Sequence, residues 1–240
     1  MPLKAVVFDV YNTLFRNDVS SWLDTFSDLC RIQKLSISPD QLWAHWKSIE
    51  VRFRQTRTNL VDPEKSPLFK TYFAAWRESF IDSFIGLGID GDADHAAQLC
   101  VDSLAVREPY EDTFALLEHV GQQWKQSVLT NADNASILPL LRYHDLSFDA
   151  VVTSEIARAY KPDPRVFALV IKETGVLPEE TLYVGDTLLD DMHGAKLAGL
   201  STVWVNRNRA EKDPELLPPD YQVGELYELV TILESLKEVD

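Results

Sequence analysis

Polar side chains of types that can do chemistry follow four short apolar runs of the chain. In chain order these residues are Asp9, Thr130, Asn131, Lys161, Asp186 and Asp191. A carboxylate is ionised at neutral pH and can act as a nucleophile when its electrophile is held in line and the developing negative charge is stabilised. Hydroxyl, amide and ammonium donors supply that stabilisation. We therefore expect Asp9 to be a nucleophile and Thr130, Asn131 and Lys161 to stabilise its reaction.

The acids at the end of this series indicate a metal site. Asp186 and Asp191, together with Asp9, offer the hard oxygen ligands that Mg²⁺ prefers. A bound Mg²⁺ would neutralise the carboxylates and orient a phosphoryl group. The residue types therefore predict a metal-assisted reaction in which Asp9 attacks the substrate and forms a covalent bond to it.

Short β-branched or apolar runs must position these residues. The runs lie at 3–9, 127–130, 149–153, 181–184 and 201–205, and helix-like segments separate those after the first. This alternation predicts an α/β fold, a Rossmann-like and mostly parallel sheet covered by helices. Ligands of such sheets bind outside the carboxyl ends of the strands, which is where the polar residues stand.

A large insertion follows the first strand. About 117 residues separate it from the next run, far more than one crossover helix requires. Amphipathic segments fill the interval at 18–34, 39–57, 67–87 and 93–107. Ser38 and Pro39 open the second of them with a helix-capping pattern, and the glycines of GLGIDG at 86–91 indicate a helix stop. We expect a small helical domain inserted into the sheet domain.

Composition excludes several kinds of partner. The chain has 38 acidic and 23 basic residues and a formal charge of -15, which disfavours binding to nucleic acid or to an anionic membrane. It has neither the apolar run of a signal peptide nor one that spans a bilayer, so we expect a cytoplasmic protein. Cys30 and Cys100 are isolated in helical segments, which favours buried reduced thiols over a disulfide.

Four motifs resemble those of the haloacid dehalogenase superfamily of hydrolases. They are, in the family's order, FDVYNTLF, VLTNAD, AYKPDPRVF and YVGDTLLDDMHGAKLAGL, and they extend to about residue 200. The resemblance implies a covalent aspartyl intermediate on Asp9, stabilised by Thr130 and Lys161, and a metal site that includes Asp186 and Asp191. It also implies a core domain of residues 1–15 and 108–240, with a cap domain of the first (C1) type at 16–107.

Tyr11 stands at a position that distinguishes two branches of this family. Most phosphatases of the superfamily carry a second Asp two residues after the nucleophile as the general acid and base, whereas 2-haloacid dehalogenases carry Tyr there. A halide leaves as an anion and needs no proton, while an alkoxide leaving a phosphate monoester benefits from an acid. STVWVNR at 201–207 is also similar to the dehalogenase branch. Tyr11 by itself favours a dehalogenase.

Other positions favour a phosphatase. The metal-independent dehalogenases carry Ser where this chain has Asp186 and Asn where it has Leu188, and Ala44 falls near the position of their cap arginine. Asn12 also replaces the glycine usual in their nucleophile motif. In the family the metal is bound by the main-chain carbonyl at the position of Tyr11, so its side chain does not prevent metal binding.

The sequence therefore predicts a Mg²⁺-dependent phosphohydrolase acting on a small phosphorylated metabolite. Since a phenol is a poorer catalytic acid than a tuned carboxyl group, we expect a good leaving group. A 2-haloacid dehalogenase is the alternative, and a catalytically inert binding protein of the same fold is a third possibility. Whether Tyr11 donates a proton or only packs is left open.

Two arginines are candidates for holding a small anionic substrate. Arg16 directly follows the nucleophile loop, where the chain leaves for the cap. Arg54 shares a helix face with Arg57 in VRFRQTR at 51–57. Instead of binding substrate, Arg16 could pair with a nearby acid, and Arg54 could belong to a solvated helix face. The sequence does not determine the oligomeric state.

Overall fold

A six-stranded parallel sheet forms the centre of one part of the protein. The computed structural model describes residues 2–237. The strands are β1 (Ala5–Phe8), β2 (Lys125–Thr130), β3 (Ala150–Thr153), β4 (Thr181–Gly185), β5 (Ser201–Val205) and β6 (Tyr221–Val223). Their order in the sheet is β3-β2-β1-β4-β5-β6, and all neighbours are parallel. The predicted α/β class and five of these strands are confirmed.

Strand β6 was not predicted as a strand. It has three residues, of which only Val223 is fully buried, so it lacks the apolar run that marks the other strands. It forms because an edge of the sheet beside β5 is available for pairing. The free edge beside β5 exists only in the folded sheet, so no local pattern in the sequence predicts β6.

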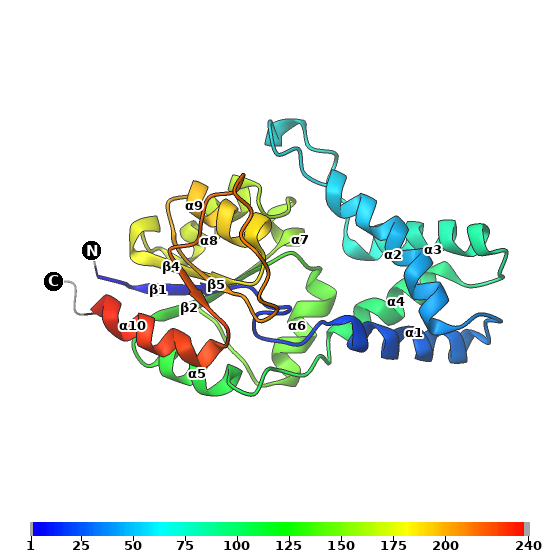
Figure 1. The fold of residues 1–240 in the computed structure, drawn as a ribbon, viewed down its shortest axis with the longest axis horizontal. Helices are drawn as coiled ribbons and strands as arrows, with labels where there is room; N and C mark the ends of the chain where they lie inside the picture. Colours follow the sequence, from blue (N-terminus) through cyan, green and yellow to red (C-terminus); the bar gives the residue numbers. More distant parts are fainter. Residues whose placement is uncertain (1, 238–240) are drawn as a thin grey trace. The chain divides into compact units, whose positions relative to one another are not determined.

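Helices cover both faces of this sheet. The helices of this part are α5 (Thr113–Gly121), α7 (Ser154–Ala157), α8 (Pro164–Thr174), α9 (Gly194–Leu197) and α10 (Leu229–Lys237). Short turns of other helix types are η2 (Pro178–Glu180), η3 (Leu188–His193) and η4 (Leu226–Glu228). Figure 1 shows α5 and α10 on one side of the sheet and α8 and α9 on the opposite side. A buried cluster that includes Val7, Leu129, Phe167 and Tyr183 fills the space beneath α8.

The other part of the protein consists of helices. They are α1 (Val19–Gln33), α2 (Pro39–Thr56), α3 (Tyr72–Leu87), α4 (Ala93–Leu104) and α6 (Asn134–Tyr143), with a short turn η1 (Pro63–Lys65). The side chain of Ser38 accepts from the N–H of Gln41 at the start of α2, and Pro39 is its first residue. Gly88 ends α3 with φ 63°, a left-handed conformation that suits glycine. The helix signals of the sequence are confirmed.

Aromatic rings form the core of the helical part. Trp22 stacks on Trp43 with 5.5 Å between ring centroids, and Trp46 stacks on Phe80 at 5.4 Å. Large rings bury much apolar surface per residue, which suits a small helical unit. Leu42 and Trp46 of α2 are buried, so the apolar face of this amphipathic helix is packing surface. Cys30 and Cys100 are buried and free, as expected.

The chain divides into two compact units, and the division differs from the predicted boundaries at Arg16 and at residues 132–146. Of the described residues, the sheet unit contains 2–16, Glu108–Asn131 and 147–237. The helical unit contains Asn17–Arg107 and Ala132–Leu146. Residues 132–146 group with the helices because α6 packs on α4, and Asp133 accepts hydrogen bonds from the N–H groups of Tyr72 and Phe73. Among residues 2–237, no helix combines the length and apolarity that crossing a bilayer requires.

Candidate functional site

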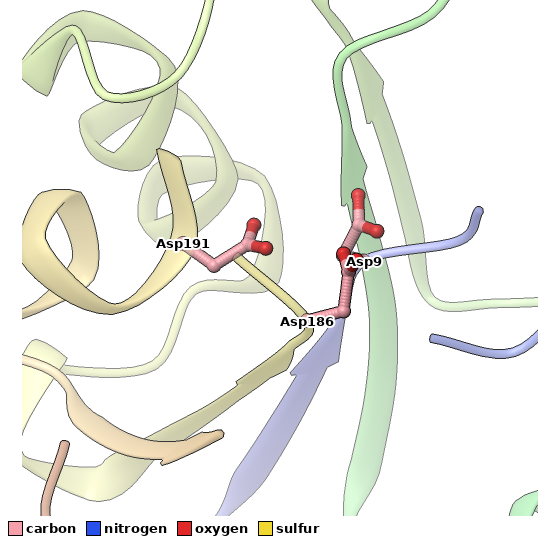
Figure 2. A group of neighbouring side chains, drawn as sticks. All are labelled: Asp9, Asp186 and Asp191. Carbon is pink, nitrogen blue, oxygen red and sulfur yellow. The ribbon is translucent and has the colours of Figure 1, made fainter. Parts of the chain in front are cut away.

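Three adjacent strands bring the predicted site residues together. β1 lies between β2 and β4, and Phe8 pairs with Val128 on one side and Val184 on the other. Asp9 follows β1, Thr130 ends β2, and Asp186 follows β4. Figure 2 shows the carboxylates of Asp9, Asp186 and Asp191 gathered beyond the strand ends. The parallel register therefore produces the cluster that the sequence predicted.

The nucleophile loop is a tight turn after β1. The N–H groups of Leu14 and Phe15 both bond to the carbonyl of Val10. Asn12 has φ 64°, the left-handed region that glycine adopts freely and that Asn tolerates better than most other residues. Its occurrence where dehalogenases have glycine is therefore compatible with the turn. The Thr13 hydroxyl lies 3.3 Å from Asp9 Oδ2, within the turn that presents the carboxylate.

Lys161 is the cation of the site. Its ammonium Nζ lies 2.7 Å from Asp9 Oδ1 and 2.6 Å from Asp191 Oδ1, and only 2% of the residue is exposed. Asn131 holds the main chain of Lys161: it accepts from the Lys161 N–H at 2.8 Å and donates to the Lys161 carbonyl at 3.2 Å. The same amide donates to Asp190 at 3.1 Å. Asn131 thus positions the lysine, and its role toward substrate stays a prediction.

Asp191 is held from both sides. Its Oδ1 accepts from Lys161 and lies 2.9 Å from the hydroxyl of Tyr183, and its Oδ2 accepts from the N–H and hydroxyl of Thr187 at 2.9 and 2.7 Å. A carboxylate has about four acceptor positions; Lys161 and Thr187 occupy three of those of Asp191, and the Tyr183 hydroxyl lies beside the fourth. The segment η3 has a π-helical turn in which Met192 N bonds to Thr187 O, and it presents Asp191 to the site.

Burial and neighbouring charges set the ionisation of Asp9 and Lys161. The pKa of Asp9 is raised to about 6, because burial and, to a smaller extent, the charge of Asp191 raise it more than Lys161 lowers it. Burial by itself would lower the pKa of Lys161, but the carboxylates of Asp191 and Asp9 outweigh it and hold that pKa well above the ordinary value. Lys161 is therefore an ammonium at neutral pH, as a donor to Asp9 must be.

The surroundings of Asp186 disfavour the ionised form of its carboxyl group. Burial raises its pKa well above the ordinary value, and the charges of Asp191 and Asp9 raise it further. The side chain is partly accessible to solvent, so the repulsion by two nearby carboxylates is the firmer cause of this direction. A cation at this position would relieve the repulsion.

The residues fit a divalent cation with oxygen ligands. One oxygen from each of Asp9, Asp186 and Asp191 lies within 4.8 Å of the other two. Lys161 and Thr187 already donate to both oxygens of Asp191, and the Tyr183 hydroxyl lies beside Oδ1, so a cation bound directly to Asp191 would compete with these contacts. Asp9 and Asp186 are therefore the better candidates for direct ligands, with Asp191 anchoring the lysine beside them.

Arg16 lies in a different environment from the acids. Its guanidinium stands 4.9 Å from the ring centroid of Tyr110, and the side chain is exposed. A cavity of about 310 Å³ is lined by Arg16, Tyr110, Glu111, Asp112, Glu225 and Tyr227. None of the predicted catalytic residues lines this cavity. The substrate role of Arg16 stays a prediction.

Arg54 belongs to an ion cluster inside the helical unit. Its Nε donates to Glu50 at 2.5 Å, and Lys47 donates to the other oxygen of the same carboxylate at 2.7 Å. Glu50 is fully buried. Glu50 stands just before the segment 51–57 and one helical turn from Arg54, so the arginines of this segment have an acid beside them. A role for Arg54 toward substrate stays a prediction beside this structural one.

Three residues of the site were not assigned roles from the sequence. Thr187 holds Asp191, Asp190 accepts from Asn131, and the hydroxyl of Tyr183 contacts Lys161 and Asp191. Thr187 and Asp190 flank predicted residues, which was the available signal. Tyr183 lies inside the run of β4, where an aromatic residue suggests only core packing.

A haloacid dehalogenase-like hydrolase family model matches residues 3–199. Among curated relatives, a phosphoserine phosphatase of Thermus thermophilus is 44% identical over 89 residues, which is 37% of this chain and 35% of that protein. The N-acylneuraminate-9-phosphatase of Homo sapiens is 33% identical over 129 residues, 52% of each chain. This chain thus spans about a third to a half of the length of these phosphatases.

Relatives matched over nearly their full length have another activity. The (S)-2-haloacid dehalogenase 4A of Burkholderia cepacia is 25% identical over 243 residues, 96% of this chain and 95% of that protein.

Among solved structures, the HAD-hydrolase YfnB of Bacillus subtilis, bound to magnesium, has a TM-score of 0.79 and 24% identity, and the match covers 97% of this chain and 99% of that one. The fold, the site and the family match agree: this chain belongs to the haloacid dehalogenase-like hydrolases.

Proposed function

We propose that the protein is a Mg²⁺-dependent phosphohydrolase that acts on a small phosphorylated metabolite with a good leaving group. The observation that carries this proposal is the carboxylate cluster of Asp9, Asp186 and Asp191, in which the pKa of Asp186 is raised by burial and by the two other acids. Such a site favours a bound cation. In a metal-free reaction, Asp186 would add only repulsion beside the nucleophile.

Asp9 is the nucleophile of the proposed reaction. An oxygen of its carboxylate forms a bond to phosphorus while the bond from phosphorus to the leaving group breaks, and the leaving group takes the electron pair. Water then attacks the aspartyl phosphate, which releases inorganic phosphate and restores Asp9. Lys161, 2.7 Å from Asp9 Oδ1, keeps the carboxylate ionised and donates to the developing charge.

Asp9 and Asp186 would hold Mg²⁺, together with the main-chain carbonyl of Tyr11 that the family resemblance implies. When bound, the ion supplies Lewis-acid polarisation of a phosphoryl oxygen. Asp191 keeps Lys161 in place beside the ligands through a contact of 2.6 Å. Thr130 is buried at the end of β2, and its hydroxyl is the proposed further donor to the phosphoryl group.

Tyr11 defines the leaving-group preference. It occupies the position where most phosphatases of the family carry an acid, and its side chain is half-buried. A phenol with a pKa near 10 transfers a proton to a leaving alkoxide less readily than a carboxyl group does. We therefore expect acyl phosphates, aryl phosphates and anhydrides to react faster than alkyl phosphates.

A 2-haloacid dehalogenase is the second candidate. Tyr11 at this position and the near full-length match to a 2-haloacid dehalogenase favour it. In that reaction an oxygen of Asp9 bonds to the substrate carbon as halide leaves with the bonding electrons, and water hydrolyses the resulting ester. This reaction requires no proton donor, and Asp186 has no chemical role in it.

One assay series separates the candidates. The purified protein is incubated with acetyl phosphate, p-nitrophenyl phosphate and 2-chloropropionate, each with Mg²⁺ and with a chelator. We expect phosphate release that depends on Mg²⁺ and disappears in Asp9→Asn. Chloride release that survives the chelator would instead establish the dehalogenase. Absence of both products and of a covalent intermediate would leave a binding protein.

A second comparison tests the role of Tyr11. We expect rates across aryl phosphates to fall as the pKa of the leaving group rises, and we expect Tyr11→Phe to change that slope little. Rates that are independent of leaving-group pKa in the wild type, and lost in Tyr11→Phe, would identify Tyr11 as an efficient acid and contradict the preference stated above.

A further inference from the structure

Tyr183 places a hydroxyl among the charged groups of the site. The residue is fully buried in β4, and its hydroxyl oxygen lies 2.9 Å from Lys161 Nζ, 2.9 Å from Asp191 Oδ1 and 3.1 Å from the carbonyl of Leu129. Its ring packs against Phe167 with 5.6 Å between centroids. The ring belongs to the apolar core, whereas the hydroxyl belongs to the polar site.

The Tyr183 hydroxyl accepts one of the three ammonium hydrogens of Lys161. The Lys161 ammonium has three hydrogens and four acceptors in reach: Asp9, Asp191, the Tyr183 hydroxyl, and the Leu129 carbonyl at 3.3 Å. The carboxylates lie nearest and take two hydrogens. The third goes to Tyr183, which is nearer than the carbonyl, and Tyr183 then donates its own hydrogen to Asp191 or Leu129.

We propose that Tyr183 is a positioning residue that fixes the Lys161 ammonium between Asp9 and Asp191. With its third hydrogen held by Tyr183, the ammonium cannot rotate away from the nucleophile without loss of a hydrogen bond. The acceptor is neutral, so it orients the ammonium without adding a further carboxylate to an acidic site. This inference rests on the proposed covalent role of Asp9 and applies to either leaving group.

The variant Tyr183→Phe tests the proposal because it removes one oxygen and keeps the ring in the core. Loss of one hydrogen bond to a charged group should lower kcat by about ten- to a hundredfold. KM should stay within about twofold, since Tyr183 acts through Lys161 and not on the substrate. The matched control is Thr181→Val, which removes a buried hydroxyl of the same strand that donates to Leu177 at 2.9 Å. It should keep the wild-type kcat.

A double-mutant cycle then separates positioning from packing. In a Lys161→Met background, which has no ammonium to orient, Tyr183→Phe should cause no further loss of kcat. An equal loss in both backgrounds would overturn the proposal, because Tyr183 would then act independently of the lysine. A fall in thermal stability with unchanged kcat would also overturn it, since the hydroxyl would then serve only the fold.

A spectroscopic measurement is independent of turnover. The ¹H–¹⁵N signal of the Lys161 ammonium, identified by its loss in Lys161→Met, should be sharp in the wild type and broadened by faster hydrogen exchange in Tyr183→Phe. A signal that Tyr183→Phe leaves unchanged would contradict the proposal. If the wild type hydrolysed none of the substrates, the proposed function would fail, and this measurement would still decide the role of Tyr183.

Discussion

At the scale of single residues, charge balance explains the site better than any one side chain. Lys161 contacts both Asp9 and Asp191, whereas the pKa of Asp186 is raised because burial and these two acids disfavour its charge. In the proposed reaction Asp9 is the attacking group, and Asp191 anchors the lysine through its contact with the ammonium. Of these three acids, Asp186 is the one whose proposed role, binding a cation, depends most directly on that cation being present.

Asp186→Asn should therefore separate metal-dependent from metal-independent chemistry. For the proposed phosphohydrolase we expect a loss of kcat/KM of about a hundredfold or more, because a metal supplies several kcal/mol of charge stabilisation. Turnover assays over a range of Mg²⁺ concentrations measure the loss. Glu211→Gln, which removes an exposed acid, is the control and should retain activity. Unchanged chloride release from 2-chloropropionate in Asp186→Asn would favour the dehalogenase.

At the scale of elements, the junction between β4 and η3 fixes Asp191. Gly185 ends β4, and a Cβ built there would lie 2.5 Å from Cγ of Asp191. That distance is far below contact, and Asp191 cannot retreat without loss of its bonds to Lys161 and Thr187. Glycine is therefore required here for close approach of a side chain to the strand end.

Gly185→Ala should displace Asp191 and lower kcat by about ten- to a hundredfold, because a small misplacement of a catalytic group has effects of that size. The matched control is Gly121→Ala, where the new Cβ would meet the flexible end of Gln126 at 3.1 Å. Steady-state kinetics and a crystal structure of each variant provide the measurement. Full activity in Gly185→Ala would show that Asp191 tolerates displacement.

The helices of the inserted unit contain a second electrostatic element. Burial by itself would raise the pKa of Glu50, but Arg54 and Lys47 outweigh it and lower that pKa below its ordinary value. A carboxyl group with a lowered folded-state pKa stabilises the fold above its unfolded pKa, and this contribution is lost as pH falls through the folded pKa. The cluster should therefore stabilise the helical unit at neutral pH and lose its effect in acid.

Glu50→Gln tests this cluster by urea unfolding at several pH values. Removing one partner of a buried ion pair costs about 3–5 kcal/mol, and since both cations are partly exposed we expect about 1–3 kcal/mol at pH 7. The difference from wild type should shrink below pH 4.5, the ordinary pKa of the group. Glu78→Gln, at an exposed pair with Lys70, should cost about 0–1 kcal/mol. A difference independent of pH would exclude the ionic explanation.

At the scale of the whole molecule, the two units should respond differently to a metal. The carboxylate cluster lies entirely in the sheet unit, so Mg²⁺ should stabilise that unit and leave the helical unit unaffected. At about a hundred times its Kd, a ligand that binds only the folded state adds about 2.7 kcal/mol.

Thermal unfolding with and without Mg²⁺ checks this expectation, and Asp186→Asn should abolish the shift. The formal charge of -15 makes the protein sensitive to screening by any salt, so NaCl at equal ionic strength is the necessary control. An identical shift with NaCl would mean general screening instead of a bound ion.

The sequence by itself determined the class of fold, the order of the first five strands along the chain and the series of polar residues from Asp9 to Asp191 at the strand ends. Apolar runs and glycine or proline signals are local, and a parallel sheet brings the residues after its strands to one edge. Only the tertiary structure decided the pairing of β6, the grouping of α6 with the inserted helices, and the place of the Tyr183 hydroxyl. These depend on distances between segments far apart in the chain or on the direction of a side chain, and neither leaves a local pattern in the sequence.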